Sequence, residues 1–390
     1  MSKCYKVMTA VGTRPEIIKL SRIIQELDRF TNHQFVHTGQ NYDYELSEIF
    51  YKDLNLRQPD FYLDAAGNNS AETISQVILK ADQIFEKEQP DAVVFYGDTN
   101  SCLAAISAKR RKIPIFHLEA GNRCFDQRVP EELNRKIIDH ISDINMPLTE
   151  HARRHLINEG IRADTIIKIG STMQEILQSH RSAIEGSQVL HQLNLTKNQY
   201  FLVSSHREEN VDSPVRFESF VKSLNALADK YQQPIIVSTH PRTRQRLDVF
   251  SSKNANALHP LIQWLKPLGF HDYNHLQLYA SCVISDSGTL TEEASILNLP
   301  AVMIRQTHER PEGMDAGVSI MADFSPDKLL QAVHIIQSQH AYQGYKYSRI
   351  EDYQEESVST KVTRAIISYI DYINRTVWHK SSSESHRQSA

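Results

Sequence analysis

The chain has 390 residues, enough for two domains with hydrophobic cores, and its apolar fraction of 40% and charged fraction of 23% are ordinary for a globular protein. A formal charge of −4 provides no general basic field, which argues against nucleic acid or a membrane surface as a partner. We expect a cytoplasmic enzyme, because the N-terminus lacks a signal-peptide pattern, no apolar run approaches the roughly 20 residues of a membrane span, and the four cysteines form no CxxC pair.

Short β-branched runs alternate with helical patterns, which is typical of parallel βαβ units. In the first half we expect strands in KVMTAVG, HQFVHTG, DAVVFYGDT, IPIFHLEAG and INMPLTE, with a helix over PEIIKLSRIIQELDRF after the first. After TIIKIGS, near Gly170, the pattern predicts a connector of helix and loop. The second half repeats the alternation in YFLVSSHREEN, PIIVSTHPR, LIQWLKPLG, SCVISDSGT and PAVMIRQ.

This alternation predicts two Rossmann-like, doubly wound α/β domains with a cleft between them. Ligands in open parallel sheets bind beyond the carboxyl ends of the strands, where the charged clusters of this chain lie. We place the N-terminal domain at 1–172 and the C-terminal domain at 173–360. A helix at 361–379 is expected to pack back on the N-terminal domain, and the polar tail at 380–390 is expected to be disordered.

The stretch VGTRPEIIK contains the first candidate site. Thr13 and Glu16 form a T-x-x-E capping box, and Pro15 falls in the first turn, where its missing N–H costs nothing. Capping does not explain Arg14, because the helix dipole disfavours a cation at this end. An anion between Arg14 and exposed N–H groups would explain it, with Lys19 adding charge farther along the helix.

Acidic residues follow two further strands. Asp98, in YGDT, ends one strand, and the alternative role for it is a cap of the helix that follows. Glu119 ends the strand IPIFHLEAG, and Glu131 begins a helical pattern after a proline. If these three acids converge at one sheet edge, they raise one another's pKa values, which suits acid/base work. The alternative is a salt-bridged loop, since Arg123, Arg128 and Arg135 lie close in sequence. If the acids are catalytic, we expect Arg123 and Arg135 to orient them.

The second half offers an anion site of its own. Ser287, Gly288 and Thr289 precede a helix, and N–H and hydroxyl donors at such a position cradle phosphate. Glu293 lies a turn and a half further and suits the two hydroxyls of a ribose. His206, in SSHREEN, ends another strand, and Arg310, in THERPEG, suits phosphate or carboxylate. The structural alternatives are a helix cap for Ser287 and a solvated helix position for Glu293.

Taken together, the motifs resemble a known family. GTRPEIIK, GDTN, EAG followed by PEELNR, SHREEN, SDSG with EEA, and ERPEG occur in the order seen in the non-hydrolysing UDP-N-acetylglucosamine 2-epimerases, and the match covers nearly the whole chain. The resemblance implies the glycosyltransferase-B architecture, a homodimer, a UDP-sugar in the interdomain cleft, and no metal or other cofactor. It also implies a mechanism in which UDP is eliminated to leave a 2-acetamidoglycal and then adds back.

The same resemblance implies roles for individual residues. The acid/base positions are matched by Asp98, Glu119 and Glu131. Essential positions near the diphosphate and leaving group are matched by Arg14, Lys19 and His206. The contacts to diphosphate, sugar, ribose and uracil are matched by Ser287, Gly288, Thr289, Arg310, Glu293 and Tyr273. Which carboxylate removes which proton stays open.

The departures from the family pattern bear on the sugar. The stretch EAGNRCFDQRVPEE is shorter than the broad pattern EAGLRTGD…SPFPEE and is similar to the branch that acts on UDP-L-sugars in capsule and O-antigen synthesis. The resemblance therefore implies conversion of UDP-2-acetamido-2,6-dideoxy-L-talose to UDP-N-acetyl-L-fucosamine. TGQNYDYEL replaces a stretch that helps to form the allosteric UDP-N-acetylglucosamine site of bacterial members, which puts such regulation in doubt.

Three alternatives stay open. The first is epimerisation of UDP-N-acetylglucosamine and UDP-N-acetylmannosamine. The second is a glycosyltransferase on the same scaffold, which would release UDP only when an acceptor is present. The third is a non-catalytic nucleotide-sugar sensor, against which the three retained acids argue.

Overall fold

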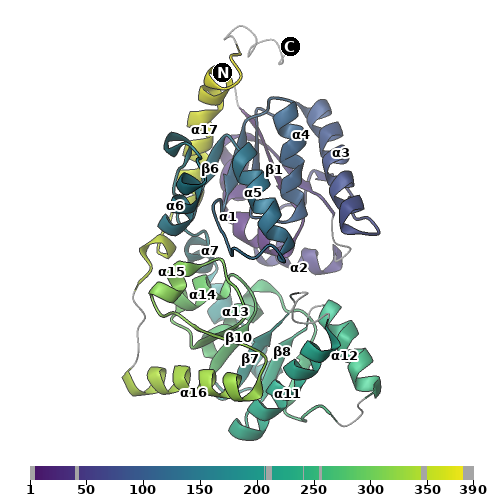
Figure 1. The fold of residues 1–390 in the computed structure, drawn as a ribbon, viewed down its shortest axis with the longest axis vertical. Coiled ribbons are helices and arrows are strands. Elements are labelled where there is room, and N and C mark those ends of the chain that lie inside the picture. Colours follow the sequence, from purple (N-terminus) through teal and green to yellow (C-terminus); the bar gives the residue numbers. More distant parts are fainter. Residues whose placement is uncertain are drawn as a thin grey trace. The chain divides into compact units, whose positions relative to one another are not determined.

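The computed structural model describes residues 5–39, 44–205, 207, 213–239, 241–253, 257–343 and 349–380. The chain divides into two compact units (Figure 1). Unit 1 comprises Met1–Gln178 and Asp352–Ala390, and unit 2 comprises Ser179–Glu351. The domain boundaries expected from sequence, at 172 and 360, differ from these limits by six and nine residues.

Unit 1 is built on a parallel sheet of six strands in the order β3-β2-β1-β4-β5-β6, the strand order of Rossmann-like folds. The strands are β1 (Lys6–Val11), β2 (Asn32–His37), β3 (Phe61–Tyr62), β4 (Ala92–Tyr96), β5 (Ile115–Leu118) and β6 (Ile144–Met146). The central strands are buried on both faces and rich in valine and isoleucine, as a covered parallel sheet requires.

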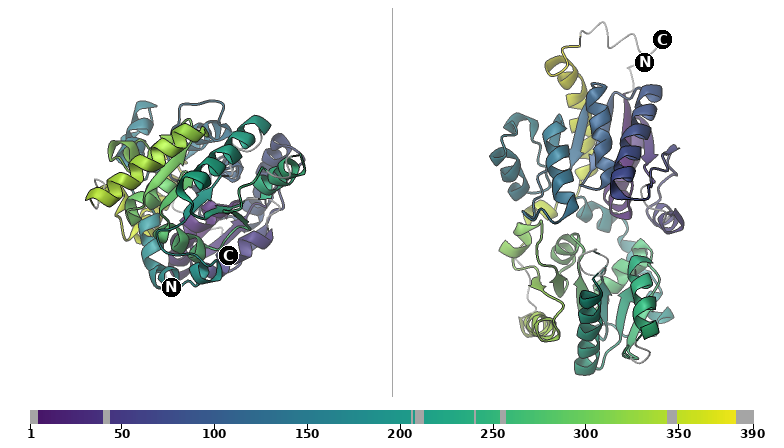
Figure 2. Two further views of the ribbon diagram at one scale, coloured as in Figure 1. Left: turned by 90° about the horizontal axis from the view of Figure 1, so that it is seen from below. Right: turned by 45° about the vertical axis from the view of Figure 1, so that its right-hand side comes forward.

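Helices cover both faces of this sheet. They are α1 (Arg14–Phe30), α2 (Tyr44–Asp53), α3 (Ser70–Glu88), α4 (Ala105–Arg110), α5 (Pro130–Ile141), α6 (Glu150–Asn158), α7 (Met173–Ser179) and α17 (Val358–Thr376), with 3-10 turns η1 (Asn100–Ala104), η2 (Ala163–Thr165) and η3 (Glu351–Tyr353). Helices α3, α4 and α5 lie on one face, and α1 lies on the other and packs against α17 (Figure 2). The predicted stripe of Ile17, Leu20, Ile24 and Leu27 is buried in α1, which confirms that helix.

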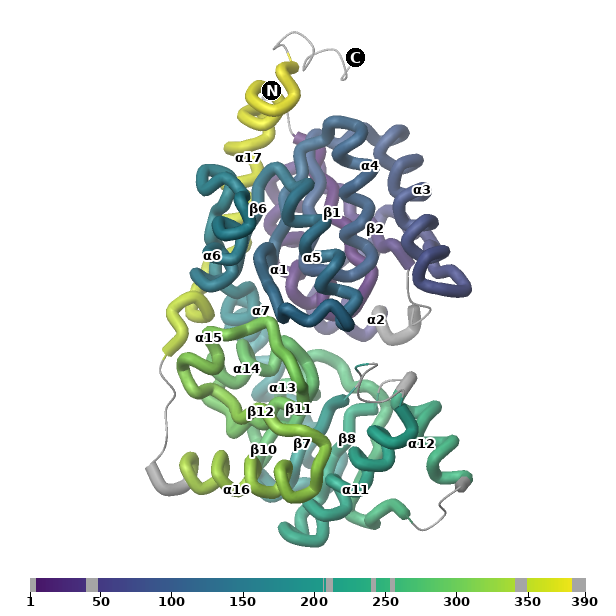
Figure 3. The backbone as a smooth tube through the Cα atoms, viewed as in Figure 1, coloured from purple at the N-terminus to yellow at the C-terminus, as the bar shows by residue number. Residues whose placement is uncertain are grey.

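Unit 2 repeats the same strand order in a second sheet, β12-β11-β10-β7-β8-β9, whose path can be followed in Figure 3. The strands are β7 (Phe201–Ser204), β8 (Ile235–Ser238), β9 (Ile262–Leu265), β10 (Cys282–Ser285), β11 (Ala301–Ile304) and β12 (Ile320–Ala322). The helices are α8 (Arg181–Glu185), α9 (Val189–Gln192), α11 (Pro214–Tyr231), α12 (Pro241–Lys253), α13 (Phe270–Tyr279), α14 (Leu290–Leu297), α15 (Pro311–Asp315) and α16 (Pro326–Gln343).

The predicted fold class, two parallel-sheet α/β domains, is confirmed. The short edge strands β3 and β12 were not predicted, since two or three residues carry no clear periodicity. The predicted connector near Gly170 is a series of three short helices, α7, α8 and α9. None of the helices in the described ranges combines the length and apolar character that a membrane span requires.

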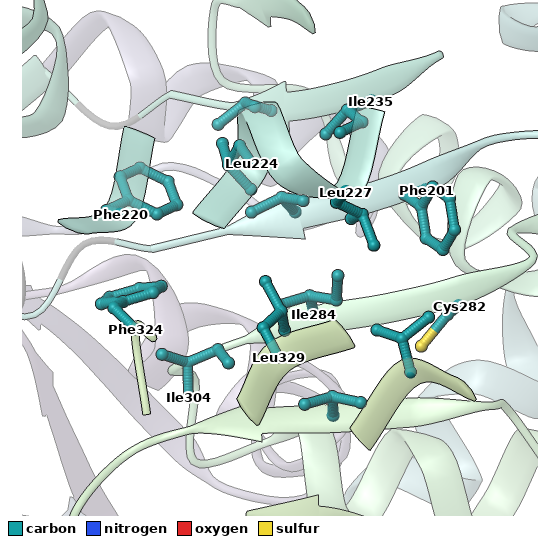
Figure 4. Close-up of a cluster of buried hydrophobic side chains, with 14 of the residues drawn as sticks. Phe201, Phe220, Leu224, Leu227, Ile235, Cys282, Ile284, Ile304, Phe324 and Leu329 are labelled. Atoms are coloured by element: carbon teal, nitrogen blue, oxygen red, sulfur yellow. The ribbon is translucent and has the colours of Figure 1, made fainter. Parts of the chain in front are cut away.

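The core of unit 2 contains a cluster of aromatic and aliphatic side chains between its sheet and helices α11 and α16 (Figure 4). Phe220 of α11 is 0% exposed, and its ring centroid lies 4.8 Å from that of Phe324 and 5.9 Å from that of Trp264. Removing this ring leaves a cavity that rigid strands cannot fill, because the interior is already close-packed.

We expect Phe220→Ala to lower the free energy of unfolding of unit 2 by about 3–5 kcal/mol. Urea unfolding in a Trp378→Phe background measures this, because the chain has two tryptophans and Trp264 then reports on unit 2. The control is Val215→Ala on the same helix, where the side chain is 73% exposed and the expected change is within about 0.5 kcal/mol. Equal effects of the two changes would contradict the core placement.

Candidate active site

The junction of β1 and α1 carries the first predicted anion site. The buried Glu16 carboxylate accepts hydrogen bonds from the backbone N–H groups of Gly12 and Thr13, both at 2.8 Å, and from the Thr13 hydroxyl at 3.0 Å. This is the carboxylate half of the predicted capping box, and its charge suits the positive end of the helix dipole. Glu16 therefore already occupies the N–H groups of Gly12 and Thr13.

Glu16 also connects α1 to the segment after β4. Its Oε1 atom accepts a hydrogen bond of 2.7 Å from the hydroxyl of Thr99, the residue after Asp98. Burial raises the pKa of Glu16 to about 7, although its hydrogen-bond donors oppose that shift. A buried acid thus joins two of the predicted motifs, GTRPE and GDT.

Two predicted cations lie on α1. Arg14 is half-buried at the start of the helix, with Cζ 6.0 Å from the ring centroid of Phe50 in α2. Lys19 reaches Glu119, at the end of β5, with Nζ 2.7 Å from Oε2 and 3.0 Å from Oε1. Both side chains of this pair are 10% exposed. The structure thus brings two predicted site residues, 100 positions apart, into one buried ion pair.

Glu119 has a backbone conformation that few residues other than glycine adopt, with a φ of 65°. Such strain persists only where the surroundings impose it, and it clusters at functional sites. The Glu119 amide donates to the carbonyl of Met146 in β6, and the side chain of Asn122 donates to its carboxylate at 3.2 Å. Glycine at position 97 lets the carboxylate approach, since a Cβ there would lie 3.3 Å from Oε2. The strained backbone supports a functional role for Glu119.

Asp98 is held by α5. Arg135 Nε donates to its Oδ2 at 2.7 Å, and the side chain of Asn134 donates to its main-chain carbonyl at 2.9 Å. The motif PEELNR therefore fixes both the carboxylate and the backbone of Asp98. Asp98 is not acting as the helix cap of the alternative interpretation, since Thr99 accepts the cap hydrogen bond from Ser101.

The two glutamates at the start of α5 have different surroundings. Glu131, the predicted acid, is half-buried. Glu132 is buried and accepts hydrogen bonds from the backbone N–H groups of Cys124 and Phe125, each at 3.1 Å. Burial works against the ionised form of Glu132, but the N–H of Cys124 and the Arg135 guanidinium outweigh it and lower the pKa. Glu132 therefore shapes the loop that departs from the family pattern.

Two of the three predicted acids are paired with a cation. Arg135 binds Asp98, and Lys19 binds Glu119. Arg135 orients Asp98, whereas the expectation that Arg123 orients the acids is wrong. Arg123 is buried and pairs instead with Asp139 and Glu159. The salt-bridged loop of the alternative interpretation and the predicted acid site are therefore formed by the same segment.

In unit 2 the predicted phosphate cradle lies between β10 and α14. The hydroxyls of Ser287 and Thr289 lie 3.0 Å apart, so they bond to each other. Thr289 is the residue before the helix, with its backbone in the helical region. Glu309 approaches Gly288 closely, since a Cβ at position 288 would lie 2.6 Å from its Oε1 atom, and the carboxylate would have to shift. The cradle has the predicted residues together with a carboxylate that was not predicted.

Glu293 and Tyr273 come from neighbouring helices of unit 2. Glu293 in α14 is buried rather than solvated, and its Oε2 accepts a hydrogen bond of 2.7 Å from the Gln277 side chain of α13. Tyr273, also in α13, is half-buried, and burial raises the pKa of its hydroxyl, which keeps it a neutral donor.

Arg310 is buried against Glu292, with its Nε 2.9 Å and its Nη2 2.6 Å from Oε1 of that residue. A neighbouring pair joins Arg305 to Glu309 at 2.8 Å. Arg305 and Arg310 are thus each already paired with a carboxylate of the same unit. The net positive charge that they present to an anionic ligand is therefore smaller than the sequence suggests.

His206, predicted near the leaving group, lies outside the described residues. Its two neighbours are held by the buried Asp286, whose Oδ2 accepts from the Ser205 hydroxyl at 2.8 Å and the Arg207 amide at 3.1 Å. Gln40 and the next three residues, from the stretch tied to allosteric regulation, also lie outside the described part. Among the described residues, no group of three or more histidine, cysteine, aspartate or glutamate side chains is arranged to hold a metal ion.

Sequence reasoning missed the carboxylates and amides that orient the site. They are Asn122, Glu132, Asn134, Gln277, Asp286, Glu292 and Glu309. Most of them belong to the motifs named in the sequence analysis and lie next to the predicted site residues in the sequence. Their position in those motifs was the available signal, but only the fold shows which partner each one has.

Comparison with known proteins adds the family. The model of the UDP-N-acetylglucosamine 2-epimerase family matches residues 25–367. The chain belongs to this family. The prediction of a non-hydrolysing UDP-sugar 2-epimerase is therefore confirmed at the level of the family.

Members of the epimerase family with solved structures share the fold along nearly the whole chain. The UDP-N-acetylglucosamine 2-epimerase of Rickettsia bellii is 53% identical with a TM-score of 0.89, over 97% of this chain and 100% of that one. The Methanocaldococcus jannaschii enzyme, solved with UDP-GlcNAc and UDP, is 33% identical with a TM-score of 0.86, over 93% and 99% of the two chains. These likenesses support the glycosyltransferase-B-like architecture.

The epimerase family also includes proteins named for another sugar. The UDP-2,3-diacetamido-2,3-dideoxy-D-glucuronate 2-epimerase of Pseudomonas aeruginosa is 32% identical over 334 residues, which are 84% of this chain and 91% of the relative. Family membership therefore identifies the substrate as a UDP-sugar but does not specify the configuration of the sugar.

The buried Glu16 predicts a pH dependence of stability. Because its folded pKa of about 7 exceeds the ordinary value of 4.5, it stabilises the fold fully below about pH 4.5, and this contribution is lost as the pH rises through 7. Relative to Glu16→Gln, the wild type should lose about 3 kcal/mol across this range. Urea unfolding in a Trp264→Phe background, where Trp378 reports on unit 1, measures the difference. A difference that stays constant from pH 4.5 to 8 would contradict the burial of an ionisable acid here.

Proposed function

We propose that this chain inverts C2 of a UDP-2-acetamido sugar by eliminating UDP and adding it back. Abstracting the C2 proton alone is difficult, because C2 is not adjacent to a carbonyl. Loss of UDP allows the electron pair of the C2–H bond to form a C1=C2 double bond while the C1–O pair leaves with UDP. The glycal then gains a proton at C2 on its other face, and the UDP oxygen bonds again to C1.

The observation that carries this proposal is the buried pair of Lys19 and Glu119 beside the ion pair of Asp98 and Arg135. Elimination and re-addition need acid/base groups around C2, because the proton leaves from one face and returns on the other. We assign this work to Asp98, Glu119 and Glu131 as a set. Each comes from a different segment of unit 1, after β4, after β5 and at the start of α5.

We propose that the nucleotide is bound by the predicted residues of unit 2. Glu293, fixed by Gln277, suits the ribose hydroxyls, and Tyr273 on the same helix as Gln277 suits the uracil. The diphosphate is assigned to Ser287, Gly288, Thr289 and Arg310, together with Arg14, Lys19 and His206 near the leaving group. Cations and N–H donors there would stabilise the charge that develops on departing UDP.

For the sugar we propose UDP-2-acetamido-2,6-dideoxy-L-talose, converted to UDP-N-acetyl-L-fucosamine for capsule or O-antigen synthesis. The supporting feature is the shortened loop before α5, in which Phe125 is 75% exposed with a left-handed φ of 56°. An exposed aromatic ring suits the methyl group of a 6-deoxy sugar. The alternative, UDP-N-acetylglucosamine, is nearer to the names of the relatives. We also propose a cytoplasmic homodimer, which sedimentation can test.

Incubation in D2O tests the reaction and the substrate together. With UDP-N-acetyl-L-fucosamine the enzyme should place deuterium at C2, because the returning proton comes from a group that exchanges with solvent. The same assay with UDP-N-acetylglucosamine should give a kcat/KM at least about tenfold lower, the scale of one well-placed apolar contact. The reverse preference would establish the alternative substrate, and no exchange with either bound sugar would reject the epimerase.

Glu119→Gln should lower turnover by about 10²-fold or more with little change in UDP-sugar binding, since the amide keeps the shape of the acid without its proton chemistry. Steady-state exchange at C2 and calorimetric titration measure the two effects. The control is Glu86→Gln, where the side chain is 71% exposed on α3 and turnover should be unchanged. Wild-type turnover by Glu119→Gln would remove this acid from the chemistry.

A further inference from the structure

A buried histidine with no role in the proposal so far lies beside the ends of both strands that lead to Asp98 and Glu119. His117 of β5 is 1% exposed, with Nε2 2.9 Å from the main-chain oxygen of Gly97 and Nδ1 2.8 Å from Oδ1 of Asp139. A carbonyl oxygen can only accept a hydrogen bond. Nε2 must therefore carry a hydrogen.

The other ring nitrogen faces a second acceptor. Oδ2 of Asp139 accepts from Nη1 of Arg123 at 2.8 Å and from the Gly121 amide at 3.1 Å, so the proton shared with His117 lies on the Oδ1 side. Burial favours a neutral Asp139, but the pairing with His117 and Arg123 outweighs it and lowers the pKa of Asp139. Nδ1 of His117 therefore faces a carboxylate that two further donors hold in place.

Arg123 connects Asp139 to a second carboxylate. It extends from Asp139 to Glu159, with Nε 2.8 Å from Oε1 and Nη2 2.5 Å from Oε2 of Glu159. The carboxylate that faces the His117 ring is therefore itself held by a buried guanidinium. Buried charges are tolerated when they are paired and hydrogen-bonded in this way.

The contacts of this cluster reach the backbone next to both candidate acids. The carbonyl of Gly97 belongs to the peptide that leads into Asp98, and Asn134 fixes the next carbonyl. The Gly121 amide, two residues after Glu119, binds Asp139, while its carbonyl lies 2.9 Å from Nδ1 of His155. The cluster therefore ties the end of β4 to the end of β5.

We propose that His117 is a positioning residue whose ring, with Asp139, fixes the spacing between Asp98 and Glu119. It touches no substrate. The kinetic consequence rests on the function proposed above, because only proton transfer at C2 needs that spacing, whereas the tie between the strand ends does not depend on it.

The hydrogen bonds of the ring are tested by nuclear magnetic resonance of enzyme labelled with ¹⁵N-histidine. The chain has 18 histidines, so the His117 signals are assigned by their loss in His117→Gln. Nε2 of His117 should carry a hydrogen in the folded wild type, because the Gly97 carbonyl that it faces can only accept. An Nε2 without hydrogen in the folded wild type would overturn the proposal, even if the variants fail to fold.

The positioning is tested by hydrogen exchange and by kinetics. In His117→Gln, amides of residues 97–99 and 120–122 should exchange at least about tenfold faster than in the control His140→Gln, whose exposed ring bonds to its own helix. With C2 exchange as the assay, kcat should fall at least about tenfold while KM stays within twofold. Unchanged amide exchange, or the kcat of the control, would overturn the role. If the wild type turned over neither sugar, the proposed function would fail, and amide exchange would still decide the positioning.

Discussion

The buried ion pair of Lys19 and Glu119 is the interaction on which the rest of the candidate site depends. It joins the first helix to the end of β5 across 100 residues of sequence, with both side chains 10% exposed. Removing one partner from such a pair costs about 3–5 kcal/mol, because the other charge is left buried without compensation. The pair also holds a glutamate whose backbone is in a left-handed conformation. Such strain persists only where the surrounding contacts impose it.

The fold explains why the charged groups gather where they do. In unit 1 the strand order reverses between β1 and β4, and in unit 2 it reverses between β7 and β10. Segments that follow these strands carry Glu16, Asp98 and Asp286, each bound to backbone or side-chain donors of a neighbouring segment. Ligands of open α/β sheets bind at such points, because the loops diverge there and leave room for them.

Much of the fold and part of the site could be predicted from the sequence. Alternating apolar runs were sufficient to predict the central strands and α1. The capping pattern was sufficient to predict the contacts of Glu16 with the start of the helix. Pairings across the fold were not predictable, because Arg135 reaches Asp98 and Lys19 reaches Glu119 only once the sheet is assembled. Arg123 shows the limit most clearly. Its place beside the acids in sequence suggested that it orients them, but its side chain is buried against Asp139 and Glu159 instead.

The central claim is that the bond between C1 and the nucleotide breaks and re-forms in every turnover. A UDP-sugar that carries ¹⁸O in the bridging position between C1 and the β-phosphorus tests this claim most directly. The account predicts that the label appears in the non-bridging β-phosphate oxygens of recovered UDP-sugar, because the free phosphate of departed UDP rotates before it adds back. Inversion at C2 with the label still entirely in the bridging position would contradict it.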